Sequence, residues 1–220
     1  MRKTMILGKW QLTTGLVVVV AGAVILGDAA SAEDMSKIVN TSHNMTNLDI
    51  WGVVIPQDRV CLPCHTPHNA RTDDRGESLV LWNHASTDQT FEMYATTAGH
   101  RGAQPEGVSK LCLSCHDGAT AIDDFGGNDD YFNNVTIPAD RLSNLGVDLR
   151  DDHPIGVEYP PPDLTGYHDK STFTGVKVVT VNGVDRVECT SCHDPHNDSL
   201  GKFLLQTMTG SALCLECHDE

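Results

Sequence analysis

Four copies of one five-residue motif account for every cysteine in this 220-residue sequence. The motif is C-x-x-C-H, and its copies are CLPCH at 61–65, CLSCH at 112–116, CTSCH at 189–193 and CLECH at 214–218. Disulfides and zinc sites also use paired cysteines, but neither requires a histidine directly after the second cysteine. The recurring histidine is therefore the feature that any explanation of this chain has to include.

This spacing is typical of covalent haem attachment, in which two thioethers hold the porphyrin and the histidine is the proximal ligand of the iron. We therefore expect four haem c groups. The attachment residues are Cys61, Cys64, Cys112, Cys115, Cys189, Cys192, Cys214 and Cys217. The proximal ligands are His65, His116, His193 and His218.

The composition predicts a fold with little ordinary core. Aromatic residues make up 5% of the chain, which has 19 glycines and 10 prolines, so side chains alone offer little apolar surface to offset chain entropy. We expect a mostly irregular fold in which short α-helices carry the motifs and haems fill the interior. One small β-hairpin is predicted at 176–188, because valine-rich segments flank Asn182 and Gly183.

The N-terminus has the pattern of a secretory signal peptide. Basic residues at 2, 3 and 9 precede an apolar run at 16–26 and an Ala-Ser-Ala site at 30–32. An uncleaved membrane anchor is the alternative, but eleven apolar residues fall short of the about 20 that span a bilayer. We predict that residues 1–32 are removed and that the chain is exported to the periplasm or the cell exterior.

Negative charge excludes some partners. Removal of 1–32 would take Lys plus Arg from 15 to 12 and Asp plus Glu from 30 to 29, which changes the net charge from -15 to -17. Such a field disfavours nucleic acid and anionic lipid, and the mature chain would have no stable membrane anchor.

An internal duplication organises the sequence. Residues 61–69 and 189–197 share C-x-x-C-H-x-P-H-N, and residues 109–117 and 211–219 share S-x-L-C-L-x-C-H-D. We predict two dihaem halves, at 33–127 and 128–220. The acidic stretch that joins them, 122–151, is expected to be a solvated loop, with calcium binding as the alternative.

Seven further histidines are available as distal ligands for four irons. His68 and His196 each lie three residues after a proximal histidine, on the same face of a helical turn. Neither can reach the far side of its own haem, so each should ligate a neighbouring haem, which predicts a stacked pair in each half.

His43 and His153 are our choices for the other two irons, because each precedes the C-x-x-C-H-x-P-H-N string of its half. His84, in an apolar stretch, is the strongest competitor. His100 and His168 are expected at the surface. A methionine ligand is a further alternative, with Met35, Met45, Met93 and Met208 as the candidates.

The sequence resembles the doubled CXXCH-motif multihaem cytochrome c family. The strings that carry the resemblance are CHTPHNA at 64–70, LWN at 81–83, SKLCLSCHDG at 109–118, NLGVDLRDDHP at 144–154, ECTSCHDPHN at 188–197 and SALCLECH at 211–218. The resemblance implies a fold organised around four stacked haems, electron transfer by bis-histidine haems, and His43, His68, His153 and His196 as distal ligands. The chain is also similar to tetrahaem cytochromes that polymerise into extracellular filaments, which implies a homopolymer as one possible assembly.

The expected function is electron transfer without catalytic residues, with redox proteins or extracellular electron acceptors as partners. The alternative is a reductase of a small oxyanion, which would need one haem with an open distal face and acid, base or cationic groups above it.

Overall fold

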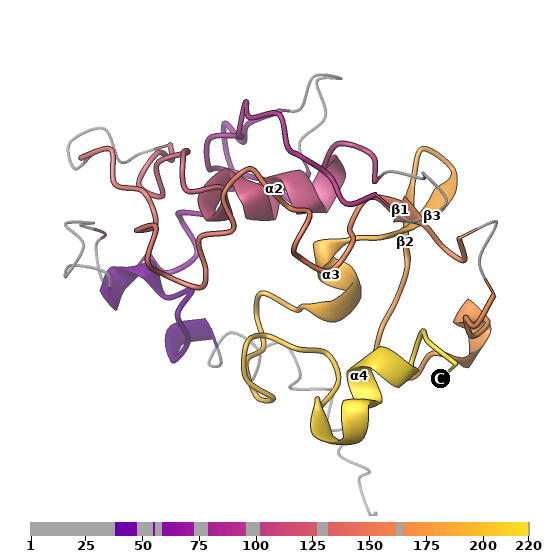
Figure 1. Ribbon diagram of the computed structural model, residues 1–220. Helices are drawn as coiled ribbons and strands as arrows, with labels where there is room; N and C mark the ends of the chain where they lie inside the picture. The colour runs from indigo at the N-terminus through magenta and orange to yellow at the C-terminus, as the bar shows by residue number, and fades with distance from the viewer. Residues whose placement is uncertain are drawn as a thin grey trace, which may run out of the picture.

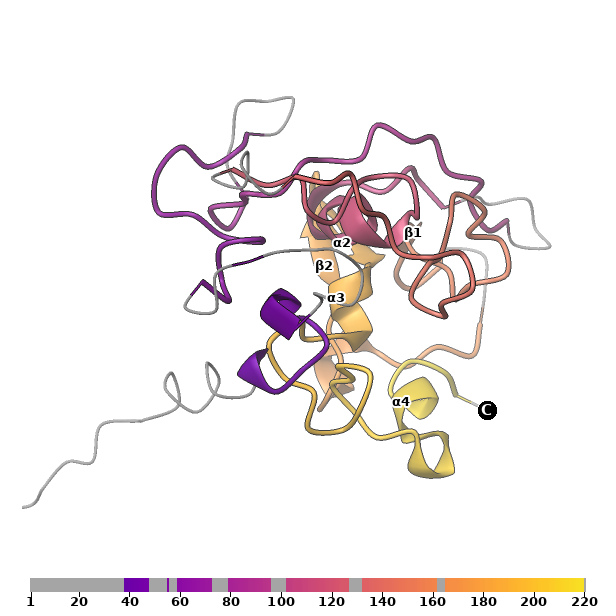
Figure 2. The same ribbon diagram turned by 90° about the vertical axis from the view of Figure 1, so that its left-hand side faces the viewer.

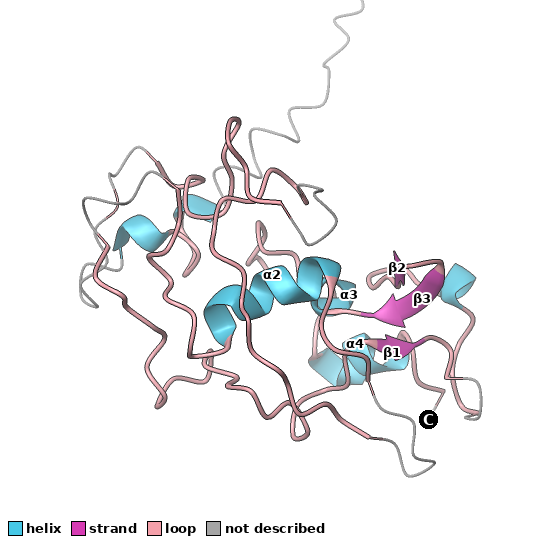
Figure 3. Cartoon of the chain, turned by 90° about the horizontal axis from the view of Figure 1, so that it is seen from above, coloured by secondary structure: helices cyan, strands magenta, loops and turns pink. Residues whose placement is uncertain are grey.

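The computed structural model describes residues 38–47, 55, 59–72, 79–95, 102–126, 132–161 and 165–219. Most of this chain is loop (Figure 3). The α-helices are α2 (Gly107–His116), α3 (Cys189–Cys192) and α4 (Ala212–Leu215), and 3-10 helices lie at Met45–Asn47, Lys170–Thr172 and Thr209–Ser211. The prediction of a mostly irregular fold with short helices is confirmed.

The predicted hairpin forms, and a third strand extends it into a sheet. Strands β2 (Val179–Val181) and β3 (Val184–Val187) pair antiparallel around Asn182 and Gly183, whose φ angles are 52° and 81°. Two consecutive positive φ angles give the turn that matches the twist of a hairpin. The expectation of a hairpin alone was wrong, because β1 (Val157–Glu158) pairs with the other edge of β3. A two-residue strand is too short to show an alternating pattern in the sequence.

Most of the buried hydrophobic side chains that the structure describes lie in the first 150 residues, and Tyr159 and Val176 are the others. One cluster of buried side chains contains Met45, Ile55, Ile122, Phe125 and Ile137, and a second contains Phe91, Met93, Leu113 and Leu149. Over 177–219, by contrast, the buried residues are Glu188 and Ser191. Residues 177–219, which hold the third and fourth motifs, therefore contribute no buried hydrophobic side chain, whereas the earlier part of the second half contributes Ile137 and Leu149 to the two clusters.

Helices α2, α3 and α4 lie one below another in the views of Figures 1 and 2. The α2–α3 contact is polar at its centre: the fully buried Ser109 hydroxyl donates to the carboxylate of Glu188 and accepts from the backbone N–H of Cys189 at 3.0 Å. Burial raises the pKa of Glu188, and the Ser109 hydrogen bond opposes that rise. This contact joins the two predicted halves, whose boundary at 127/128 stays a prediction.

The predicted signal peptide at 1–32 lies outside the described residues. Within the part that is described, none of the helices has both the length and the apolar character needed to cross a bilayer.

Candidate functional site

Each C-x-x-C-H motif forms a single helical turn. The backbone N–H of the histidine donates to the carbonyl of the first cysteine in three of them: His65 to Cys61 at 2.8 Å, His193 to Cys189 at 3.0 Å and His218 to Cys214 at 2.9 Å. The remaining motif closes α2, which ends at His116. One turn therefore carries two thiols and an imidazole in each copy, as attachment of a haem requires.

Three of the predicted proximal imidazoles are held in one tautomer. The Nδ1 atoms of His65, His116 and His193 lie 2.7, 2.7 and 2.8 Å from the backbone carbonyls of Val80, Ser143 and Lys202. A carbonyl oxygen can only accept, so Nδ1 donates and Nε2 keeps the lone pair that binds a metal. The ring of His218 packs instead 4.9 Å from the ring of Tyr167.

The carbonyls that hold His65 and His193 come from a repeated loop that motif alignment did not find. Val80 and Leu81 have φ angles of 49° and 55°, and Lys202 and Phe203 have 52° and 59°. Such angles are uncommon outside glycine and are strained. The duplication therefore extends beyond the motifs, and insertion of residues between motif and loop in the first half hides it from a fixed-offset alignment.

The backbone pairing of these loops repeats as well. Thr66 N–H donates to Leu81 at 2.9 Å, and Asp194 N–H donates to Phe203 at 2.8 Å. Asn83 N–H donates to Cys64, and Leu205 N–H donates to Cys192. Each loop thus folds back on its motif by the same two hydrogen bonds.

A hollow of about 490 Å³ opens at the first motif. It is lined by Ile38, Val39, Arg59, Val60, Cys61, Leu62, His65 and Pro67. Its volume is within the about 300–1,000 Å³ of small-molecule and cofactor sites, and its apolar walls suit a flat macrocycle. Because Cys61 and His65 both face this hollow, the residues present fit a haem bonded at the first motif.

Two predicted distal histidines face proximal ones. The ring of His196 lies parallel to that of His65, with centroids 6.0 Å apart and planes at 20°. The ring of His43 lies 6.2 Å from that of His116, with planes at 64°. A metal–imidazole bond of about 2.0 Å, with the centroid about 1.1 Å further on, separates two rings on one metal by about 6 Å. Both pairs have the spacing of imidazoles on opposite sides of one iron.

The other two predicted distal histidines are less defined. Burial lowers the pKa of His153, and the hydrogen bond to the Pro154 carbonyl opposes this change. The positive charge of the nearby His218 lowers the pKa of His153 further. His153 therefore lies close to the proximal histidine of the fourth motif. His68 is exposed. The ring contacts found among the described residues do not bring it opposite another histidine.

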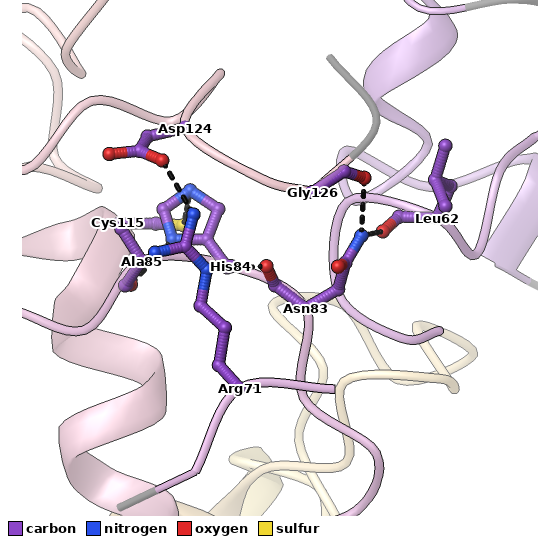
Figure 4. Close-up of polar contacts among 8 residues, drawn as sticks. All are labelled: Leu62, Arg71, Asn83, His84, Ala85, Cys115, Asp124 and Gly126. Atoms are coloured by element: carbon purple, nitrogen blue, oxygen red, sulfur yellow. Dashed lines mark hydrogen bonds and ion pairs between the residues drawn. The ribbon is translucent and has the colours of Figure 1, made fainter. Parts of the chain in front are cut away.

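His84, the competing candidate for a distal ligand, lies beside the second motif. It is 1% exposed, its Nδ1 lies 2.8 Å from the Ala85 carbonyl, and its Nε2 lies 3.5 Å from Cys115 Sγ (Figure 4). Burial lowers its pKa, which favours the neutral ring. With both nitrogens next to protein groups, His84 lines the second motif.

A polar brace surrounds His84. Arg71 donates to Asp124 at 2.8 Å, and the Asn83 amide donates to the carbonyls of Leu62 and Gly126 at 2.7 and 3.0 Å (Figure 4). Asn83, which is 2% exposed, thereby ties the first motif to the chain that follows the second.

The structure also describes the surroundings of three of the four candidate methionine ligands and of one of the two histidines expected at the surface. Met45 and Met93 are buried in the two hydrophobic clusters, and Met208 is 54% exposed. His168 is half-buried, and His100 and Met35 lie outside the described residues.

The alternatives for the cysteines find no support. The structure contains no disulfide between any of the eight cysteines. In the part of the chain that is described, no three His, Cys, Asp or Glu side chains gather closely enough to bind a metal ion as a zinc or calcium site would.

Successive motifs lie next to one another. Burial raises the pKa of the Cys115 thiol, and the neighbouring Cys64 thiol raises it further. The thiols of Cys112 and Cys189 are hydrogen-bonded to each other. Burial raises the pKa of Cys192 to about 11, with Cys217 among the neighbours that add to it. The chain therefore brings the first motif to the second, the second to the third and the third to the fourth.

Asp117 anchors the loop after the second motif. It is 3% exposed and accepts hydrogen bonds from the Thr87 hydroxyl, from the Ala119 N–H, and from the N–H and hydroxyl of Thr120. Burial raises its pKa, but these donors outweigh burial and leave the pKa below its usual value.

We expect Asp117→Asn to lower the free energy of unfolding by about 1–3 kcal/mol, because an amide replaces a charged acceptor. A depressed carboxyl pKa stabilises the fold above pH about 4 and loses that effect as the pH falls further. Denaturant unfolding between pH 2 and 7 should show a flatter acid limb in the variant. Asp219→Asn, the equivalent and exposed position in the fourth motif, is the control, and an equal loss in both variants would contradict the assignment.

One protein-family model matches the C-terminal part of the chain. The family model for the doubled CXXCH motif matches residues 182–220, which hold the third and fourth motifs. No curated protein sequence matches the chain significantly. C-x-x-C-H motifs bind haem c covalently, and their paired arrangement at 182–220 is typical of multihaem c-type cytochromes.

Proposed function

We propose that the chain is an exported tetrahaem cytochrome c that carries electrons through four mostly bis-histidine haems, without catalytic residues. The observation that carries the proposal is the row of adjacent motifs, from first to fourth, through neighbouring thiols. Haems bonded to neighbouring thiols lie close together, and closely spaced irons can pass electrons in sequence. The bound haem supplies the one-electron chemistry, and the chain ligates, orients and shields it.

The proposed ligands follow the repeat. Proximal histidines are 65, 116, 193 and 218, and distal histidines are 196, 43 and 153 for the irons of His65, His116 and His218. His68 then completes the iron of His193, because it has the same place in the first half as His196 has in the second.

The partners that suit this design are redox proteins or extracellular electron acceptors. The acidic surface disfavours nucleic acid. Assembly into a homopolymer rests on the family resemblance alone, and electron microscopy of the secreted fraction for thin filaments tests it.

We expect the purified mature protein to have a c-type haem absorption spectrum and a mass that includes four haems. Six-coordinate irons should give low-spin electron paramagnetic resonance (EPR) signals and should bind little carbon monoxide when reduced. A protein without bound haem would overturn the whole proposal. Tight carbon monoxide binding at one haem of the native protein would instead favour an oxyanion reductase.

A further inference from the structure

We infer that residues 193–204 of the second half complete the iron sites of the first half: His196 ligates the iron of His65, and Pro195 and Phe203 position His43 on the iron of His116. This inference rests on the proposed haem function and deepens it, because it states how the iron sites of the first half depend on residues of the second half.

The first step is the contact between His196 and His65. These residues are 131 positions apart and belong to different predicted halves, yet their rings are nearly parallel with centroids 6.0 Å apart. His196 is 51% exposed in its side chain and lies 3.4 Å from Asp194 through Nδ1. A carboxylate on Nδ1 orients an imidazole so that Nε2 points to a metal.

The second step concerns His43. Its Nδ1 lies 3.1 Å from the Pro195 carbonyl and donates to it, and its ring stacks on Phe203 with centroids 4.2 Å apart and planes at 14°. Figure 2 shows the indigo segment that carries His43 beside the yellow-orange loops of the second half. A hydrogen bond at Nδ1 and a stacked ring together fix the orientation of His43, whose ring centroid lies 6.2 Å from that of His116.

The third step is the strained turn that presents Phe203. Phe203 has a φ of 59°, a left-handed backbone conformation that is strained for a bulky residue. Its equivalent in the first half, Leu81, has the same strained conformation but is 52% exposed and has no aromatic ring. The first half therefore shares the turn but cannot offer the same stacking surface.

This arrangement differs from the sequence-based expectation of a stacked haem pair within each half. His196 does reach a neighbouring iron site, but that site lies in the other half. Repeat symmetry could not reveal this, because an alignment of two halves shows what they share and not how they meet.

The test is His196→Gly in the four-haem protein. We expect four haems to remain by mass, one low-spin EPR signal to become high-spin, and about one haem in four to bind carbon monoxide when reduced. Near-parallel imidazoles give rhombic low-spin signals, so the lost signal should be rhombic. Added imidazole should restore it, which a merely structural defect would not allow.

A protein that lacks the haem of the first motif tests whether His196 ligates the iron of that haem. In a Cys61→Ser, Cys64→Ser protein with three haems, His196→Gly should create no further high-spin haem. A new high-spin haem there would overturn the inference and leave the proposed function intact. If that protein does not accumulate, the type of EPR signal lost from the four-haem protein decides, and loss of a strongly anisotropic signal would overturn the assignment.

The positioning role of Phe203 has its own readout. Phe203→Ala should shift the g values of the haem ligated by His43 and His116 while all four haems stay attached and low-spin. Leu200→Ala is the control, because it truncates a side chain of the same second-half loop that is 50% exposed and should leave the spectrum unchanged. Equal spectra for Phe203→Ala and the native protein would contradict this part of the inference.

Discussion

Replacement of Cys112 and Cys115 together by alanine should remove one haem and lower the yield of folded protein by more than tenfold. Cys115 packs against the cluster formed by Met45, Ile122, Phe125 and their neighbours, and the Cys112 thiol contacts Cys189 of the third motif. A haem at this position would be part of the interior of the first half.

The size of the effect follows from burial. If roughly 400 Å² of apolar haem surface is buried, its loss removes about 10 kcal/mol of gross stabilisation at about 25 cal/mol per Å². Whole domains are stable by only about 5–15 kcal/mol. The loss is therefore comparable to the entire net stability, and a protein with three haems would unfold or be degraded.

The matched control is Cys214→Ala with Cys217→Ala. It also removes one haem, but Cys214 is exposed and residues 177–219 include no buried hydrophobic side chain, so that Tyr159, which donates to the Cys217 carbonyl, is the buried aromatic residue beside this motif. Haem content by mass spectrometry and thermal unfolding of the secreted proteins measure both variants. Equal yields for the two double variants would show that the second motif is no more central than the fourth.

Local chemistry was accessible from the sequence. Motif spacing predicts the turns that carry the cysteines, and turn propensity predicts the hairpin at Asn182 and Gly183. Both signals act within a few residues of chain. The small hydrophobic core follows from the overall composition. The meeting of His196 with His65 depends instead on how two distant loops pack. Short-range pattern carries no information on such a contact.

The supporting residues were missed for a different reason. Val80, Ser143 and Lys202 act through their backbone carbonyls, so their side chains give no signal. His84 was named as an alternative ligand because an apolar stretch surrounds it in the sequence, and only the three-dimensional structure shows its contact with Cys115.

Leu113→Ala should lower the free energy of unfolding by about 2–5 kcal/mol, the usual cost of a large-to-small change in a closed core. Leu113 is 0% exposed and packs with Phe91, Met93 and Leu149. It lies inside the second motif, between the two cysteines, so the cavity would open directly beside the haem attachment site.

The fourth motif provides the control for this change as well. Leu215 has the same place between two cysteines as Leu113 but is 42% exposed, so Leu215→Ala should cost less than about 1 kcal/mol. Denaturant unfolding of both variants with all four haems attached measures the difference. If the two leucines cost the same, packing of Leu113 among other side chains does not determine the stability of the protein, and contacts with the haems do. A large difference would mean that the duplicated motifs have the same chemistry but contribute differently to the stability of the fold. The second motif would then be part of the hydrophobic core, and the fourth would be held in place chiefly by its haem.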